Sequence, residues 1–256
     1  METQIDLTKS AQDNANDYFI RSKRAKKKLE GAQQSVLDLE KKLERARSRL
    51  ERSSFKKKIK IITKQEWYEK FNWFFTSSGM LTIGGRDAVQ NEAINSKHFE
   101  NADLFFHADI FGASLVVLKD GRDTDDGTKL EAAQFAACHS SAWKQGLSTV
   151  NVYALRREQV SKSSNKGSLG TGSFAMSGER EWFRGVKLEL AAFLDEGKRL
   201  NIVPAIALER LGQKGVRILI GETKKSDAAK TIAKRLGYDD IDYVMQQLPA
   251  GEFSIG

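Results

Sequence analysis

The chain has 256 residues, of which 40% are hydrophobic and 30% charged, a composition typical of a globular protein with a charge-rich extension. It contains no apolar run near the roughly 20 residues that a membrane-crossing helix needs, and its single cysteine, Cys138, excludes an internal disulfide. We expect a cytoplasmic protein, because unpaired cysteines are typical of reducing compartments.

The net charge of +8 is concentrated near the N-terminus. Residues 1–64 hold 18 Lys and Arg against 9 Asp and Glu, a net of +9, whereas the rest holds 24 against 25, a net of −1. A surplus this local attracts polyanions and makes their binding salt-dependent. The same residues are also compatible with the solvated face of a charged helix, and the sequence alone leaves both interpretations open.

The first segment is predicted to be a long helix. After a flexible N-terminus at 1–13, a basic coiled-coil segment is expected at 14–58, with its helix running from about Ala15 to Arg52 and Asp13 or Asn14 as its cap. Apolar residues then recur in steps of three and four, at Leu29, Ala32, Val36, Leu39, Leu43, Ala46 and Leu50. A stripe this narrow needs a partner helix, from a second copy or from another protein.

The basic side chains of this segment form what we call the basic arm. It consists of Arg24, Lys26, Lys27, Lys28, Lys41, Lys42, Arg45, Lys56, Lys57 and Lys58. If the arm binds a ligand, that ligand is expected to carry many phosphates.

The remaining elements mix helices and strands, which predicts an α+β fold with a mixed sheet and packed helices. Helices are expected at 64–75, 88–97, 129–146, 188–200, 226–236 and 241–248. Strands are expected at 80–83, 103–107, 115–118, 148–155, 216–220 and 253–255. We divide this part into a core at 59–186 and a C-terminal continuation of the same domain at 187–256.

Two glycine-rich sites are candidates for anion binding. Gly84-Gly85 permits positive φ or a close backbone approach, and Asp87 is placed to cap the following helix, whose first amides can receive a phosphate. The Ser/Gly-rich segment, residues 161–174, is either a mobile surface loop or a phosphate cradle. It lacks the Gly-Lys-Ser/Thr ending of a nucleotide-binding P-loop, which argues against an NTPase.

Few residues suggest catalysis. A metal-dependent nuclease acting through Asp87, His107 and Asp109 is one alternative, but no spaced third metal ligand accompanies the His-Ala-Asp sequence. Neither a nucleophile elbow nor a dinucleotide fingerprint is present. We therefore expect a non-catalytic protein without a metal or cofactor. The polar residues near its glycines are more typical of an RNA-binding surface than of a reaction centre. These residues are Arg86, Asp87, Asn91, His107, Asp109, Ser114 and Lys144.

Four blocks of the sequence closely resemble the NFACT-R domain of the NFACT family, of the RqcH and NEMF type. They are WYEKFNWFFTSSGMLTIGGRDAVQNE at 67–92, ADLFFHADIFGAS at 102–114, EAAQFAACHSSAWKQG at 131–146 and VSKSSNKGSLGTGSF at 160–174. The basic helix before them is similar to the coiled-coil middle region of the family. Two departures are Gly170, where a proline is expected, and the acidic loop at 120–128.

The resemblance implies an RNA-binding component of ribosome-associated quality control. Its expected partners are the large ribosomal subunit with peptidyl-tRNA, and tRNA or rRNA, with Thr171 and Ser173 added to the RNA-binding set. No NFACT-N region is recognisable, so the peptide-tailing activity of the family is not carried over, and a partner bearing that region is one expectation. A third alternative is an adaptor that recruits a protein through its coiled coil.

Overall fold

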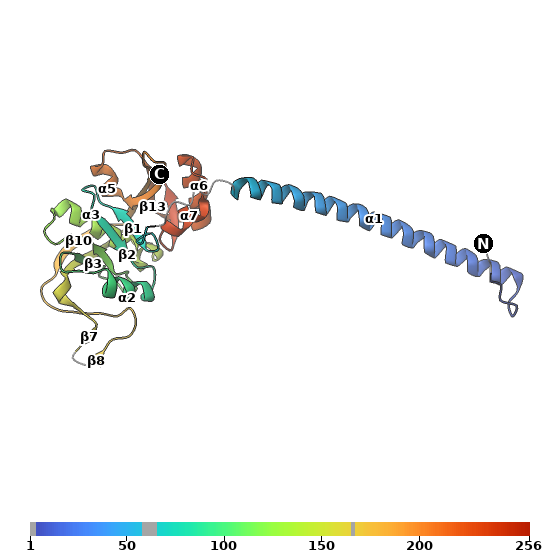
Figure 1. The fold of residues 1–256 in the computed structure, drawn as a ribbon, viewed down its shortest axis with the longest axis horizontal. Coiled ribbons are helices and arrows are strands. Elements are labelled where there is room, and N and C mark those ends of the chain that lie inside the picture. The colour runs from blue at the N-terminus through green and yellow to red at the C-terminus, as the bar shows by residue number, and fades with distance from the viewer. Residues whose placement is uncertain (1–3, 58–65, 165–166) are drawn as a thin grey trace. The chain divides into compact units, whose positions relative to one another are not determined.

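The computed structural model describes residues 4–57, 66–164 and 167–256. The chain divides into two compact units, residues 1–64 and residues 65–256. The first unit contains one long helix, and the second is a globular α+β unit (Figure 1). These features confirm the predicted fold class.

Helix α1 (Ala11–Lys57) begins four residues earlier than predicted. Ser10 starts it, because Ser10 Oγ accepts a hydrogen bond from Asp13 N at 3.1 Å, so neither of the predicted residues is the cap. The apolar stripe of this helix is solvent-exposed in a single chain, with Leu29 59% exposed and Leu39 63% exposed. Among the described residues, no helix is both long and apolar enough to span a membrane.

The globular unit is built on two sheets whose strand pairings are all antiparallel among the described residues, where a mixed sheet was predicted. The larger has the order β1-β2-β4-β3-β5-β10, with β1 at Asn72–Phe75, β2 at Leu81–Gly84, β4 at Val116–Leu118, β3 at Leu104–Ala108, β5 at Thr149–Arg156 and β10 at Glu181–Lys187. The smaller has the order β12-β11-β13-β14, with β12 at Leu200–Pro204, β11 at Glu189–Leu194, β13 at Val216–Lys224 and β14 at Glu252–Ile255.

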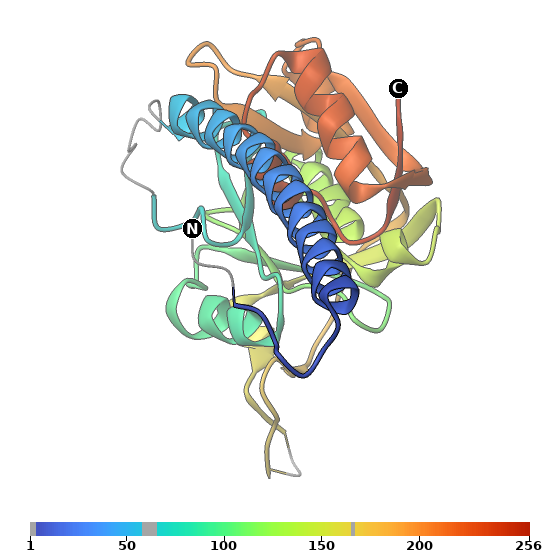
Figure 2. The ribbon, with the colours of Figure 1, turned by 90° about the vertical axis from the view of Figure 1, so that its right-hand side faces the viewer.

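Two short pairs complete the strands. β6 (Val160–Ser161) pairs with β9 (Ala175–Met176), and β7 (Ser163–Ser164) pairs with β8 (Gly167–Ser168) in a hairpin that projects from the globular unit (Figures 1 and 2). The helices are α2 (Ala88–Lys97), α3 (Asp126–Cys138), α4 (Ser141–Lys144), α5 (Ala205–Arg210), α6 (Lys225–Leu236) and α7 (Ile241–Gln247), with a 3₁₀ turn at Arg157–Gln159.

Helix α3 lies between the two sheets and contributes to the main core. One face of the larger sheet, including Phe74, Phe106 and Leu118, packs with α3, and β11, β12 and α6 belong to the same core. The smaller sheet is covered by α6, drawn red against orange strands in Figure 2. The alternation of strand side chains sends neighbouring residues of β3 to opposite faces.

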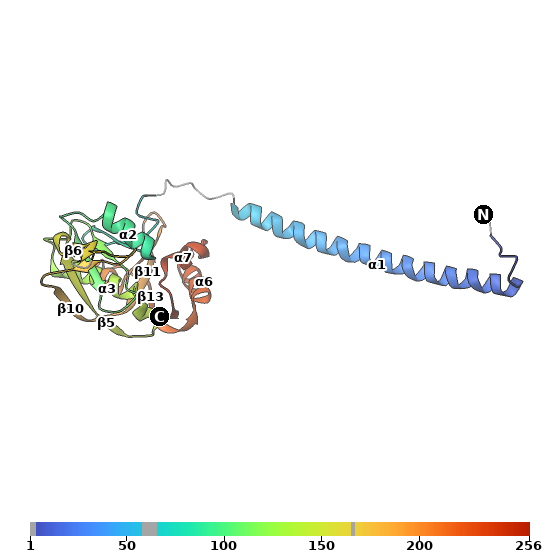
Figure 3. The same ribbon diagram turned by 90° about the horizontal axis from the view of Figure 1, so that it is seen from below.

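The opposite face of the larger sheet forms a second core. It contains Phe105 and Tyr153 from the sheet and Ile94 from α2. Figure 3 shows α2 over this part of the unit and the edge strand β10 at a distance from it. His107 follows Phe105 by two residues in β3 and therefore faces the same side.

Two predicted helices are wrong. Residues 64–75 were expected to be helical, but Phe71 ends a turn and β1 follows, with the strand pattern of buried Phe74 and exposed Phe75; Lys64 lies outside the described residues. Residues 188–200 instead form β11 and the start of β12. β11 is a central strand that is buried on both faces. Its sequence is therefore a continuous apolar run, and such a run lacks the periodicity that distinguishes a strand from a helix.

The predicted helix at 129–146 is two helices. α3 begins at Asp126 inside the acidic loop, where Asp125 caps it by accepting from Thr128 N at 3.1 Å. The helix then breaks at His139, and Ser140 caps α4 by accepting from Ala142 N at 3.2 Å. The serine hydroxyl competes for backbone donors, which favours a new helix start over continuation.

Replacing Asp103 with alanine is expected to destabilise the globular unit. The carboxylate is fully buried and accepts hydrogen bonds from Lys119 Nζ at 2.6 Å, Asp120 N at 2.9 Å and Glu100 N at 2.7 Å. Removing it leaves Lys119 without its buried partner, at a cost of about 3 kcal/mol. Urea unfolding of the full chain measures the loss. Asp123→Ala, at an exposed position in the loop that contains Asp120, is the matched control and should change stability by less than about 0.5 kcal/mol.

His139 is expected to make stability depend on pH. Burial of the ring, which lies 4.3 Å from that of Phe135, and the positive charges of Lys225 and Arg86 lower its pKa to about 3. Because the unfolded pKa of 6.5 is higher, the unfolded state binds more protons, and this stability is complete above pH 6.5 and lost as pH falls toward 3.

Between pH 7 and pH 5 the loss attributable to His139 is about 2 kcal/mol. Chemical unfolding at both pH values measures it. The variant His139→Gln, which has no titrating group at this position, should show a correspondingly smaller loss. Equal losses in the two proteins would contradict the assignment.

Candidate RNA interface

The turn that carries Gly84-Gly85 depends on a close approach of the backbone. Neither glycine has positive φ. An added Cβ on Gly85 would lie 2.1 Å from Asn91 Oδ1. This oxygen accepts a hydrogen bond from Leu115 N at 3.1 Å. The glycine is therefore required because Asn91 fills the space in which a side chain would lie.

Ser114 and Asp87 also maintain this turn. Ser114 Oγ lies 2.7 Å from Gly85 O and 2.9 Å from His139 O, so it joins the turn to the junction of α3 and α4. Asp87 accepts from Gln90 N at 2.8 Å and caps α2, as predicted. Three of the residues proposed from sequence, Asp87, Asn91 and Ser114, thus have structural partners within the protein.

Arg86 is different, because no carboxylate in the described part of the chain pairs with its positive charge. Its Nε donates to Asn72 Oδ1 at 3.2 Å and its Nη2 to Phe71 O at 2.9 Å, both neutral acceptors. Lys225 is similar, since its Nζ donates to Leu248 O at 2.7 Å. Neither residue belongs to an ion pair within the described residues.

Electrostatics place these two cations near each other. Burial lowers the pKa of Arg86, and burial followed by the charge of Arg86 lowers the pKa of Lys225. Because the two positive groups repel each other, an anion bound beside both would be stabilised by their charges. This arrangement suits a phosphate better than a metal ion.

The Ser/Gly-rich segment docks beside the start of α2. Lys162 Nζ pairs with the Glu92 carboxylate and lies 3.3 Å from Ser173 O. Gly172 N donates to Glu92 Oε2 at 3.2 Å. Thr171 and Ser173 are exposed at this place. The structure therefore brings the two glycine-rich sites together, although Lys162 and Gly172 already bind a carboxylate.

His107 lies in a row of aromatic side chains across three strands. The strand register pairs His107 with Tyr153, and Tyr153 with Trp182, so all three share one face of the larger sheet. The Tyr153 hydroxyl is 3.3 Å from His107 Nδ1, and the Tyr153 and Trp182 rings are 5.3 Å apart. Burial lowers the pKa of His107, so the imidazole is mainly neutral at pH 7.

Two arginines missed by the sequence reasoning flank this row. The Arg180 guanidinium carbon is 4.4 Å from the Tyr153 ring centroid, and that of Arg184 is 4.0 Å from the Trp182 centroid. We call Tyr153, Arg180, Trp182 and Arg184 the arginine–aromatic cluster. The signal in the sequence was the spacing Arg-x-Trp-x-Arg, which places all three side chains on one face of a strand.

Lys144 lies apart from these contacts, whereas the negative charge of Asp109 acts on His107 and Tyr153, although burial has the larger effect on the pKa of each. Asp109 is exposed just after β3, where its backbone N donates to Asn151 O at 2.8 Å. Lys144 is exposed at the end of α4, and its Cα lies near Gly251. Across residues 4–57, 66–164 and 167–256, no three His, Cys, Asp or Glu side chains are grouped to hold a metal, so Asp87, His107 and Asp109 do not form such a group.

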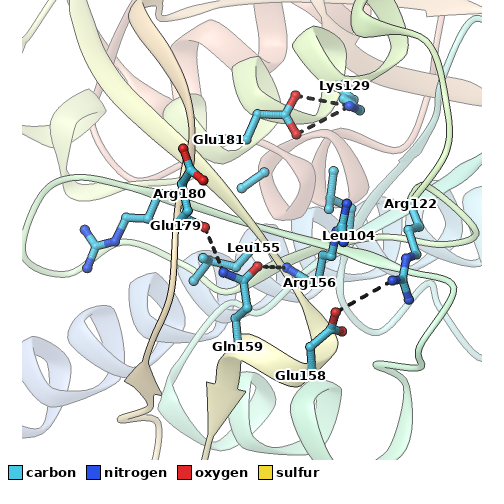
Figure 4. A pocket seen from close by; sticks show the side chains of 11 residues that line it. Leu104, Arg122, Lys129, Leu155, Arg156, Glu158, Gln159, Glu179, Arg180 and Glu181 are labelled. Atoms are coloured by element: carbon cyan, nitrogen blue, oxygen red, sulfur yellow. Dashed lines mark hydrogen bonds and ion pairs between the residues drawn. The ribbon is translucent and has the colours of Figure 1, made fainter.

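A polar pocket of about 500 Å³ lies where β3 and β10 begin and β5 ends (Figure 4). Its charges are largely paired within the protein. Lys129 Nζ is 3.1 Å from Glu181 Oε1, and Arg122 Nη2 is 3.7 Å from Glu158 Oε1. Arg180 points away from these ion pairs in Figure 4. The paired charges make this pocket a weaker candidate than the cluster beside it.

The basic arm is exposed on α1 over residues 21–47. Lys56 and Lys57 lie in the last turn of the helix, and Lys58 lies outside the described residues. The exposed cations of the arm, from Arg24 to Arg45, are therefore available to a phosphate backbone along about six helical turns.

Comparison with known proteins identifies relatives of this chain. Residues 70–178 match the model of the NFACT protein RNA binding domain. The chain is 36% identical over 209 residues to the archaeal Rqc2 homologue aRqcH of Methanocaldococcus jannaschii, an alignment that covers 78% of this chain and 31% of the relative.

Two animal relatives are also similar to this chain. The ribosome quality control complex subunit NEMF homologue of Drosophila melanogaster is 32% identical over 84% of this chain and 22% of its own length. The human subunit NEMF is 34% identical over 66% of this chain and 16% of its own length. The chain thus spans less than a third of each of these relatives. Through its RNA-binding domain, it belongs to the NFACT family.

Proposed function

We propose that this chain is an RNA-binding component of ribosome-associated quality control, without catalytic activity of its own. In this role it binds the large ribosomal subunit that holds peptidyl-tRNA, through tRNA or rRNA, in the cytoplasm. The observation that carries the proposal is the match of residues 70–178 to an RNA-binding domain. This range includes Arg86, His107 and the Ser/Gly-rich segment. The names of the relatives, which are ribosome quality control subunits, support the cellular context.

The charges of the chain support contacts of two kinds. The exposed cations of the basic arm suit a sequence-independent grip on a phosphate backbone, which positions a protein on RNA. Arg86, with its neutral partners, suits a single phosphate on the globular unit, where Lys225 adds a second positive charge. Thr171 and Ser173, exposed beside α2, add hydroxyl donors that suit phosphate or 2′-hydroxyl groups. The roles of Asp109 and Lys144 in this binding rest on the same expectation.

The apolar stripe of α1 supports self-association. Leu29, Leu39 and Leu43 are exposed along one line of the helix, at the spacing of a coiled coil. We propose that a second copy of the chain, rather than a partner bearing an NFACT-N region, covers this stripe, because the repeat is regular enough to be self-complementary.

Removing positive charge from the arm is expected to weaken RNA binding and its dependence on salt. Each phosphate contact adds about 0.9 to the slope of log K against log salt on a duplex, so replacing Lys26, Lys27 and Lys28 with glutamine should lower the slope by about 2 to 3. Filter binding of tRNA and of large ribosomal subunits by the full chain, at several salt concentrations, measures the slope. The matched control replaces the same three lysines with arginine and should keep it. Absent or salt-independent binding by the wild-type chain would refute the proposal.

Leu39→Lys is expected to disrupt the proposed coiled coil. A lysine at a central seam position places like charges opposite each other in a two-stranded coil, which favours the monomer. Sedimentation velocity of the full chain should show a dimer for the wild type and a monomer for this variant. Leu37→Lys is the control, because Leu37 is similarly exposed at 51% but lies off the seam. A monomeric wild-type chain would rule out self-association through α1.

A further inference from the structure

The arginine–aromatic cluster lies partly beyond the matched RNA-binding domain. The match ends at residue 178. Arg180 follows just before β10, and Trp182 and Arg184 lie on that strand. β10 is an edge strand of the larger sheet, so one side of it is open to a ligand. None of these three residues was a candidate from sequence, and any role for them extends the RNA-binding face past the recognised domain.

The side chains of β10 alternate between the two faces of the larger sheet. Glu181 pairs with Ala154 in the register and Phe183 with Val152, so both point toward α3. Glu181 forms its ion pair with Lys129 on that side, and Phe183 packs near Phe106, with the ring centroids 5.8 Å apart. The alternate residues therefore face the other way, where they meet Tyr153.

A β-bulge places Arg184 over the indole. The pairing of β10 with β5 shifts between Phe183 and Val186, and Gly185 within the bulge has φ of +60°. Gly185 N donates to Asn151 Oδ1 at 3.0 Å, which holds the bulge in place. As a result the Arg184 guanidinium lies 4.0 Å from the centre of the Trp182 ring. A glycine is needed here, because other residues rarely adopt positive φ.

The cluster has the chemistry of a nucleotide-stacking site. Arg180 and Arg184 are exposed, and within the described part of the chain neither belongs to an ion pair. A guanidinium stacked on an aromatic ring is planar on its outer side, where an unpaired base can stack and a neighbouring phosphate can be bound. Two acidic residues flank Arg180 in the chain. Glu179 lines the polar pocket, and Glu181 forms its ion pair with Lys129 on the opposite face.

We infer that the arginine–aromatic cluster binds single-stranded RNA, with one unpaired base stacked on the Arg184–Trp182 pair and an adjacent phosphate held by Arg180. This inference rests on the proposed RNA-binding function and specifies unpaired nucleotides as the ligand of the arginine–aromatic cluster. Duplex RNA does not satisfy the site, because its bases are already stacked and are not available to a side chain. Aromatic stacking is tolerant of sequence, so the site discriminates strandedness rather than base identity.

The experiment compares two fluorescent RNA probes of equal length, an unstructured oligouridylate and a blunt duplex, in binding titrations with the full chain. Trp182→Ala and Arg184→Lys are expected to weaken binding of the single strand by about ten-fold, since one stacked base contributes roughly that factor. Duplex binding should change by less than about two-fold. Trp182→Phe, which keeps an aromatic face, should restore most of the affinity.

Arg184→Lys is the sharper variant, because it keeps the charge, leaves the salt slope unchanged and removes only the planar group. Arg199→Lys, at an exposed arginine before β12, is the matched control and should bind both probes as the wild type does. Thermal melting of each variant excludes loss of the fold as the cause of weaker binding. If folded Trp182→Ala and Arg184→Lys bind the single strand with wild-type affinity, the inference fails and the RNA-binding function stands. If the wild type binds neither probe, both fail.

Discussion

The burial of α3 between two sheets is the constraint on which the globular unit depends. Four alanines of this helix, Ala132, Ala133, Ala136 and Ala137, are fully buried and let the sheets approach closely. Two buried polar side chains then set the spacing. Glu131 binds Ser77 N at 2.7 Å, and Gln134 binds both Lys187 O at 3.2 Å and Ile206 N at 3.0 Å. Because an unsatisfied polar group in this core would be costly, these contacts determine where the strands lie.

That arrangement also produces the row of aromatic side chains. With one face of the larger sheet committed to α3, the alternate residues of β3, β5 and β10 must face the other way. His107, Tyr153 and Trp182 are direct neighbours in the register and therefore form a continuous row. The bulge in β10 has a second consequence, because it twists an edge that would otherwise be open to pairing with another strand. One irregularity thus protects the edge and orients Arg184.

The polar residues around the glycine turn and those of the cluster differ in what remains free to bind. Asn91 and Ser114 satisfy backbone groups of the turn, whereas Arg86 donates only to neutral acceptors among the described residues. Arg180 and Arg184 likewise contact rings rather than carboxylates. Positive side chains that are not paired with a carboxylate are available to bind a polyanion. This distinction separates residues that build the face from residues that are placed to contact RNA.

The sequence by itself determined the long basic helix with its apolar seam, the α+β class, the cap at Asp87 and the glycine requirement at the turn. These depend on local spacing and local hydrogen bonds, which short stretches specify. It did not determine that 189–194 is a strand, since a strand buried on both faces has no visible period. Nor did it identify Arg180 and Trp182 as neighbours of Tyr153. Only the tertiary structure decided that, because strand register brings residues almost 30 positions apart into contact, and no local pattern encodes the register.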